Sequence, residues 1–166
     1  MILEVIRELY DYNAWANQKI LTQAAHVSPE DFLRNFPGVS FGSLRSTLAH
    51  TMLVQQNWLL RWQGQQLVDW PDLSTYPDFP TIQTLWAEIE TRTQAFVAAV
   101  DEAKLDGVVE YMNRAGTHYA YKLRQLMVHQ VNHATQHRSE AAVILTALGC
   151  SPGNWDYPYY LDERFA

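Results

Sequence analysis

Cysteine is almost absent from this chain, which contains only Cys150 among its 166 residues. A single cysteine forms no internal disulfide, which fits a protein that folds in a reducing compartment. No apolar run approaches the roughly 20 residues that a membrane-spanning helix needs. Residues 1–8 are amphipathic and acidic, unlike a secretory signal. These absences predict a cytoplasmic protein without a membrane partner.

Basic residues are also in the minority, since 12 Lys and Arg stand against 18 Asp and Glu and give a formal charge of −6. Nucleic-acid binding needs a basic patch to contact phosphates, and no Lys/Arg cluster occurs, so we expect no nucleic-acid partner. An apolar content of 48% and a charged content of 18% are ordinary for a globular protein. The length predicts a single domain over residues 1–166.

Several familiar catalytic motifs are missing. The chain has no glycine-rich phosphate loop, no Gly-x-Ser-x-Gly turn and no Cys-x-x-Cys pair. A zincin helix requires Glu directly after its first histidine, whereas Gln130 follows His129 and Ala134 follows His133. A di-iron bundle requires Glu-x-x-His on two helices, which does not occur. The mechanisms that depend on these motifs are therefore excluded.

Hydrophobic periodicity predicts four long helices. Their expected ranges are residues 2–25, a second helix capped by Ser40 or Ser43 and ending at 64, a third capped by Thr81 and ending near 106, and residues 122–148. Pro29 marks a short extra helical start, and Pro71 and Pro77 predict a loop over 65–78. Residues 108–121 change to a hairpin-like pattern. The predicted fold is all-α, a four-helix bundle with a short hairpin-like insertion before the last long helix.

Histidine is concentrated in that last helix, where His129, His133 and His137 stand four residues apart. Residues with this spacing share one face of a helix, and neutral imidazole is the commonest metal ligand. His129 and His137 are separated by about 12 Å along the axis, at 1.5 Å per residue. Metal–imidazole bonds measure only about 2 Å, so a single ion cannot bind all three. We therefore expect only one adjacent pair of these histidines to bind the ion.

Helix phase selects the pair. At about 100° per residue, His137 lies about 40° from the middle of the apolar stripe, His133 about 80° and His129 about 120°. His133 and His137 therefore form the inward pair. His129 is expected as a hydrogen-bond donor to a metal ligand, beside a cleft, or on the surface. A third ligand must come from elsewhere. His50 is preferred because it lies within a helix, although that helix is apolar on nearly all sides, and His26 and His118 are weaker alternatives.

Several segments resemble one known family. Residues 126–140, Leu-Met-Val-His-Gln-Val-Asn-His-Ala-Thr-Gln-His-Arg-Ser-Glu, are similar to the signature helix of the DinB-like (DinB/YfiT) metal-binding proteins. Residues 12–21, Tyr-Asn-Ala-Trp-Ala-Asn-Gln-Lys-Ile-Leu, resemble the first helix of that family, and residues 40–50 resemble the entry to its second helix. Residues 156–161 resemble its usual tail. The segments occur in the expected order over almost the whole chain.

The resemblance implies a four-helix bundle, commonly dimeric, with a metal held by His50, His133 and His137. Where the family usually has Arg-Gly-Gln after the last histidine, this chain has Arg138-Ser139-Glu140. We expect Glu140 either to orient a ligand imidazole or to lie on the outside. Histidine ligands suit zinc, nickel, copper or iron, of which we favour zinc or nickel.

Three histidines with a vacant fourth position are typical of a catalytic metal site. Relatives in the wider family resemble thiol-dependent S-transferases or isomerases, so the leading hypothesis is an enzyme that activates a low-molecular-weight thiol towards an electrophile. A non-catalytic, stress-related metal binder or sensor and a metal-dependent hydrolase are the alternatives. A hydrolase needs a general base, for which the candidates are His129, Glu140 and Asp156. The residues proposed as pocket lining are Trp15, Asn17, Trp58 and Tyr121.

Overall fold

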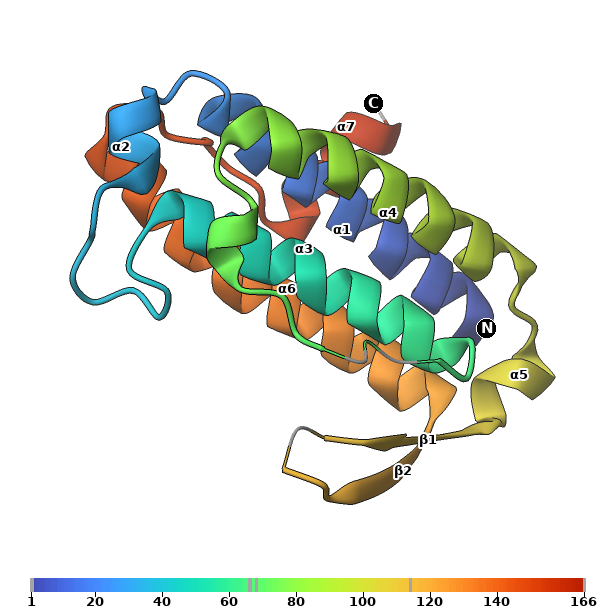
Figure 1. Cartoon of the computed structure of the whole chain (residues 1–166). Coiled ribbons are helices and arrows are strands. Elements are labelled where there is room, and N and C mark those ends of the chain that lie inside the picture. Colours follow the sequence, from blue (N-terminus) through green and yellow to red (C-terminus); the bar gives the residue numbers. More distant parts are fainter. Residues whose placement is uncertain (1, 66, 68, 114, 166) are drawn as a thin grey trace.

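Four long helices lie side by side along the molecule (Figure 1). They are α1 (Ile2–Ala24), α3 (Leu44–Trp62), α4 (Phe79–Ala99) and α6 (Leu123–Ala147). Each packs against two of the others: α1 contacts α4 and α6, and α3 contacts the same two helices. This computed structural model describes residues 2–65, 67, 69–113 and 115–165. Residues 1, 66, 68, 114 and 166 lie outside the described residues, so the predicted loop, hairpin turn and chain ends are described without them.

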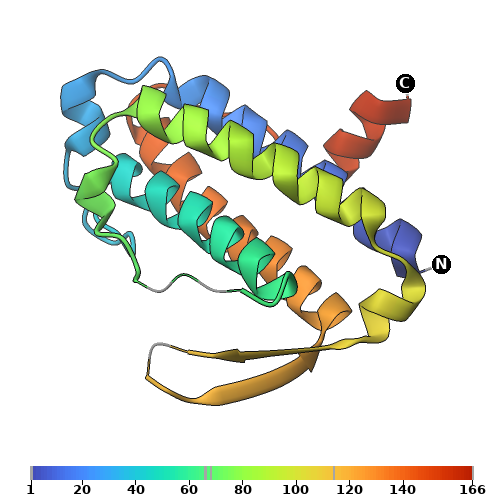
Figure 2. The same cartoon turned by 45° about the vertical axis from the view of Figure 1, so that its right-hand side comes forward.

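Short elements connect and flank the long helices. They are α2 (Pro29–Leu33), the 3-10 turn η1 (Leu73–Thr75), α5 (Glu102–Asp106), β1 (Val108–Met112), β2 (His118–Lys122) and α7 (Tyr157–Phe165). The two strands pair antiparallel, from Val108 opposite Lys122 to Met112 opposite His118. Figure 2 shows this hairpin extending alongside the α3 and α6 side of the molecule, just before α6 begins. The predicted all-α class with a hairpin before the last long helix is thus confirmed.

Helix boundaries differ from the expectations at the third helix. Its cap is Asp78 instead of Thr81, because the Asp78 side chain accepts the backbone N–H of Thr81 and α4 already begins at Phe79. The expected extension to residue 106 was also wrong. Val100 is extended and Asp101 caps the separate helix α5 by accepting the N–H of Lys104. The extended Val100 therefore ends α4, and the Asp101 side chain starts α5.

A buried arginine ties α6 to α1. Arg138 is 2% exposed, and its guanidinium donates to the Oδ1 atoms of Asn13 (2.5 Å) and Asn17 (2.9 Å) and to Thr135 Oγ1 (2.7 Å). Burial lowers the pKa of Arg138 to about 10, so it remains a cation at neutral pH. A buried charge needs hydrogen bonds to offset its lost hydration. These contacts therefore fix the rotation of α6, and with it the direction of the neighbouring His137.

The described residues include no helix that is both long and apolar enough to cross a membrane.

Removing one acceptor from Arg138 should destabilise the fold. We expect Asn13→Ala to lower the free energy of unfolding by about 2–3 kcal/mol, because a buried charged donor loses its partner. Chemical denaturation followed by circular dichroism measures this. Asn132→Ala, at an exposed site of α6, is the matched control and should change stability by less than about 0.5 kcal/mol. Equal effects of the two substitutions would contradict the role given to Arg138.

Candidate metal centre

Packing of α3 against α6 brings three histidines together. His50 belongs to α3, whereas His133 and His137 lie one turn apart on α6. One ring nitrogen from each lies within 4.8 Å of the others, and the ring centroids are 4.5 to 5.4 Å apart. His137 is buried with 4% exposure, and the other two are half-buried. The structure thus assembles the trio expected from the sequence, while its role as a ligand set stays a prediction.

The spacing of the nitrogens suits one small cation. His133 Nε2 and His137 Nε2 are 3.2 Å apart. Two nitrogens bound to a tetrahedral zinc ion at about 2.0–2.1 Å lie about 3.3 Å from each other. Three imidazoles also match the borderline-soft donor set that zinc, nickel and copper accept. The residues present therefore fit a divalent transition metal.

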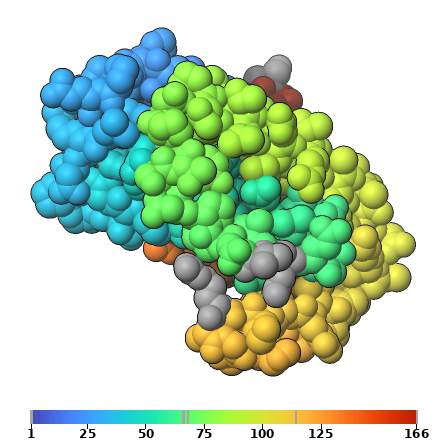
Figure 3. Space-filling view, viewed as in Figure 1, coloured from blue at the N-terminus to red at the C-terminus, as the bar shows by residue number. Residues whose placement is uncertain are grey.

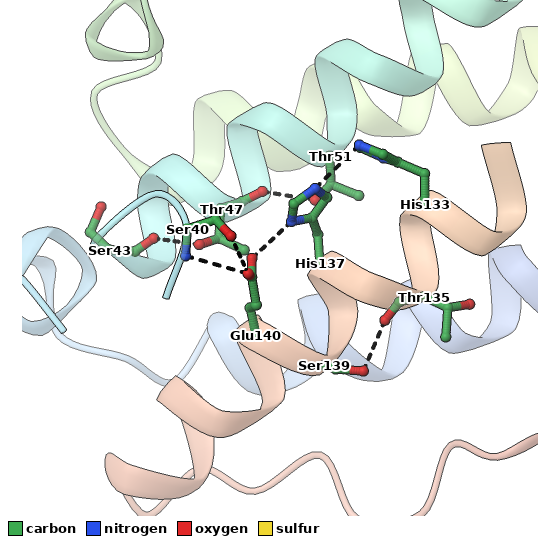
Figure 4. Close-up of polar contacts among 9 residues, drawn as sticks. All are labelled: Ser40, Ser43, Thr47, Thr51, His133, Thr135, His137, Ser139 and Glu140. Carbon is green, nitrogen blue, oxygen red and sulfur yellow. Dashed lines mark hydrogen bonds and ion pairs between the residues drawn. The ribbon is translucent and has the colours of Figure 1, made fainter. Parts of the chain in front are cut away.

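Glu140 orients the most buried imidazole (Figure 4). Its Oε2 accepts a hydrogen bond from His137 Nδ1 at 2.8 Å, and its Oε1 accepts from the backbone N–H and the hydroxyl of Ser40. A proton held on Nδ1 leaves the Nε2 lone pair facing the other histidines. Of the two positions expected for Glu140, the structure thus shows the one that orients an imidazole. Of the two serines expected as caps, Ser43 caps α3.

The conformation of the loop before α3 places Ser40 next to Glu140. Gly42 has φ +72°, and a Cβ there would lie 2.7 Å from Asn35 Oδ1. The Phe36 N–H closes the loop by donating to the Gly42 carbonyl at 2.6 Å. Glycine is favoured here because it accepts a left-handed conformation and leaves room for the asparagine.

The same loop supplies an aromatic cover for His50. The Phe41 ring stacks on the His50 ring with centroids 4.0 Å apart and planes inclined by 26°, and it lies 5.4 Å from the His137 ring. Trp70, from the loop after α3, lies 6.1 Å from His50. Sequence periodicity missed Phe41 because it lies outside the helix. Its position in the segment that resembles the entry to the family's second helix was the available signal.

Burial keeps two of these imidazoles neutral. Desolvation, followed by the proximity of His137 and His133, lowers the pKa of His50 to about 4. Desolvation, followed by His137 and His129, lowers the pKa of His133 to about 4. For Glu140, burial acts to raise the pKa, but the hydrogen bonds from Ser40 and His137 outweigh it and the pKa falls. At neutral pH His50 and His133 are thus uncharged donors near a carboxylate, which are the protonation states that metal binding requires.

A pocket of about 440 Å³ adjoins the trio at His133. Its lining comes from α3, α6, the loop after α3 and the hairpin, and consists of Val54, Asn57, Trp58, Arg61, Trp70, Asn113, Ala115, His129 and His133. Figure 3 shows the loop after α3 and the hairpin on one face of the molecule. A ligand in the pocket has direct access to His133.

The other predicted site residues occupy different places. His129 is exposed in this pocket, with its ring 5.3 Å from that of Trp58 and 6.0 Å from that of His133, as expected for a residue beside a cleft. Asp156 directly precedes α7, and its carbonyl accepts the backbone N–H groups of Tyr159 and Tyr160. His26 follows α1 and His118 lies on β2, and neither belongs to the cluster.

Three of the four proposed lining residues lie outside the pocket. Only Trp58 lines it. Trp15 donates to Glu163 and packs against α7, Asn17 bonds the buried Arg138, and Tyr121 is 43% exposed on β2. Aromatic residues serve a second cluster around α7 as well as the pocket, and sequence alone did not separate the two sets.

Comparisons with known proteins identify the family. A family model described as DinB family matches residues 1–164, so the chain belongs to the DinB family. The protein named DinB of Bacillus subtilis (strain 168) is 25% identical over 161 residues, which cover 93% of this chain and 92% of the relative. A crystal structure of a conserved protein from Enterococcus faecalis has a TM-score of 0.63 at 11% identity, covering 82% of this chain and 92% of that one. This likeness shows a shared fold.

Acidification should destabilise the metal-free protein. The folded-state pKa values of His50 and His133, about 4, lie below the ordinary 6.5, so the unfolded chain binds more protons between these limits. The free energy of unfolding therefore falls as pH decreases from about 6.5 towards 4. Urea unfolding of chelator-treated protein across the upper half of this window, above the ordinary titration of carboxyl groups at about pH 4.3, measures the effect. His133→Gln should show a shallower dependence, and an unchanged slope would contradict this account.

The Glu140 contact should contribute to metal affinity. We expect Glu140→Ala to weaken zinc binding by about 10–100-fold, because His137 loses the partner that fixes its ring and tautomer. Competition with a chromophoric chelator gives the affinity. Ser139→Ala is the control, since this exposed neighbour bonds only within α6 among the contacts in Figure 4. Equal zinc affinities of Glu140→Ala and the wild type would refute the orienting role.

Proposed function

We propose that this member of the DinB family binds one divalent transition metal, zinc or nickel, through His50, His133 and His137, and that it acts as a metal-dependent enzyme on a low-molecular-weight thiol. The observation that carries the proposal is the convergence of three imidazoles, one of which, His133, also lines a pocket. Three protein ligands beside an accessible space are typical of catalytic metal sites, whereas structural sites use four.

A bound metal of this kind supplies Lewis acidity, which lowers the pKa of a bound thiol and makes sulfur nucleophilic at neutral pH. The protein's own residues provide the rest. Glu140 holds the proton of His137 on Nδ1, and Phe41 covers His50 from the loop side. The pocket beside His133 offers room for the thiol's remaining atoms and for an electrophile.

A hydrolase is the second candidate, favoured by the location of His129. Of the three general-base candidates, Glu140 is occupied by Ser40 and His137, and Asp156 lies at α7. Among these candidates His129 alone lines the pocket. Partial desolvation there lowers its pKa, so its imidazole is neutral at pH 7 and able to accept a proton. No described residue of the pocket supports a non-catalytic metal binder or sensor over the two enzymes. The homodimer and the cytoplasmic location stay predictions.

Metal binding and thiol consumption should be lost together. We expect metal-loaded wild type to consume a cellular thiol, among cysteine, glutathione and coenzyme A, in the presence of an alkylating electrophile. A chelator should stop the reaction. His50→Ala and His133→Ala should each lose more than about 100-fold in metal affinity, beyond the effect of an outer partner, and should lose thiol consumption with it. Elemental analysis and a colorimetric thiol assay provide the two measurements.

His118→Ala is the matched control, because His118 lies on β2 outside the cluster, and it should retain both properties. Unchanged metal content in His50→Ala and His133→Ala would refute the site itself. A flat time course with every thiol, despite full metal loading, would refute the thiol function. Ester hydrolysis that disappears in His129→Ala would then favour the hydrolase.

A further inference from the structure

One cation in the pocket, Arg61, forms no ion pair with any acidic residue that the structure describes. Arg61 lies in the last turn of α3, and its guanidinium carbon is 4.8 Å from the Trp58 ring and 4.4 Å from the Tyr111 ring. These rings pack edge to face at 5.2 Å. Arg61 is therefore held between α3 and the hairpin by cation–π contacts, which do not use the hydrogen-bond donors of its guanidinium.

The charge of Arg61 is not neutralised by the described part of the chain. Its Nε is buried without a hydrogen-bond partner, and no ion pair joins it to a described carboxylate. Five other cations do have such partners, namely Lys19, Arg34, Lys122, Arg124 and Arg164. Arg61 differs from the other described cations without an ion pair because it lines this pocket, which none of them does. Desolvation lowers the pKa of Arg61, which favours binding of an anion.

The pocket that Arg61 lines has no acidic wall. Its described lining contains neither Asp nor Glu, and Arg61 is the one residue there that is charged at neutral pH. Trp58 and Trp70 add apolar surface between the polar groups. An anionic ligand therefore meets one attractive charge and no described repulsive one.

Arg61 and the histidine trio lie at different levels of α3. His50 and Arg61 are eleven residues apart, which corresponds to about 16 Å along the axis. Trp58 contacts His129, one turn of α6 away from His133, so the contacts between the two helices progress away from the trio towards Arg61. A ligand that reaches both ends must be extended.

We propose that the pocket binds an extended thiol whose far end carries an oxyanion, a carboxylate or phosphate, with the oxyanion on Arg61 and the thiol at the histidine trio. The planar guanidinium matches the geometry of both oxyanions. The thiol end rests on the proposed function, whereas the oxyanion site depends only on the pocket. Arg61 is then a specificity-determining residue that periodicity did not single out.

The experiment uses cobalt-loaded protein and two series of ω-mercapto compounds of increasing chain length, one ending in a carboxylate and the other in an alcohol. Sulfur-to-cobalt charge-transfer absorption reports thiolate binding without any turnover. At a chain length that spans the pocket, we expect the carboxylate to bind at least about tenfold more tightly than the alcohol, as a charge-assisted hydrogen bond provides. Mercaptoalkyl phosphonates of the same length distinguish phosphate from carboxylate preference.

Arg61→Met should abolish the preference and leave the alcohol series unchanged, and Arg61→Lys should retain part of it. Arg45→Met is the matched control, because Arg45 lies on the same helix and also has a buried, unpartnered Nε, but it does not line the pocket. This control should keep the full preference. The wild-type length series tests the charge preference even if an Arg61 variant does not fold.

Equal binding of carboxylates and alcohols at every length, or a preference that survives in Arg61→Met, would overturn the oxyanion site. Failure of the thiol function gives a different result. In that case no thiol produces the charge-transfer band, while alkyl carboxylates still quench tryptophan fluorescence in wild type and not in Arg61→Met. Such quenching supports the oxyanion site by itself, and its absence together with an absent band overturns both proposals.

Discussion

The contact between α3 and α6 is the constraint on which the site depends. These helices run so that His50 meets His133 and His137 at one level, while Trp58 meets His129 at the next. Consecutive side chains on a helix point about 100° apart, so the rotation of α6 about its axis decides which side chains face His50. Arg138 on one side and Glu140 on another hold that rotation by bonding α1 and the loop before α3. Arg138 and Glu140, which lie within one turn of α6, thus link the buried contact with α1 to the metal centre.

Glu140 stands where the resemblance to the family implies a glutamine, and its negative charge affects the contact with His137. A carboxylate accepts the His137 proton more strongly than an amide does, and it raises the basicity of the opposite ring nitrogen. Its own cost of burial is offset by two donors from Ser40. The substitution therefore preserves the orienting position and adds a negative charge beside a site suited to a cation.

The pocket combines features with different consequences for a ligand. His133 and His129 supply uncharged nitrogen donors, whereas Arg61 supplies a positive charge at some distance from the trio. Aromatic rings line the space between them. Such a division suits recognition of a molecule at two ends, because a directional charge contact at one end sets the register of the reactive group at the other. Loops and the hairpin complete the pocket, so its shape depends on segments outside the four long helices.

Local sequence patterns determined the all-α class, the long helices and the hairpin, because periodicity and capping residues act over a few positions. Phase on α6 also ordered His137, His133 and His129 correctly by burial, and the family resemblance supplied His50. Only the tertiary structure decided that His50 faces this pair and that Glu140 turns inward. It also placed Phe41 and Trp70 beside the trio and Arg61 in the adjoining pocket. Helix α3 is apolar on nearly all sides, so its sequence does not show which side faces the core. Loop residues have no periodicity from which the orientation of a side chain can be inferred. Their neighbours are set by packing between segments distant in the chain.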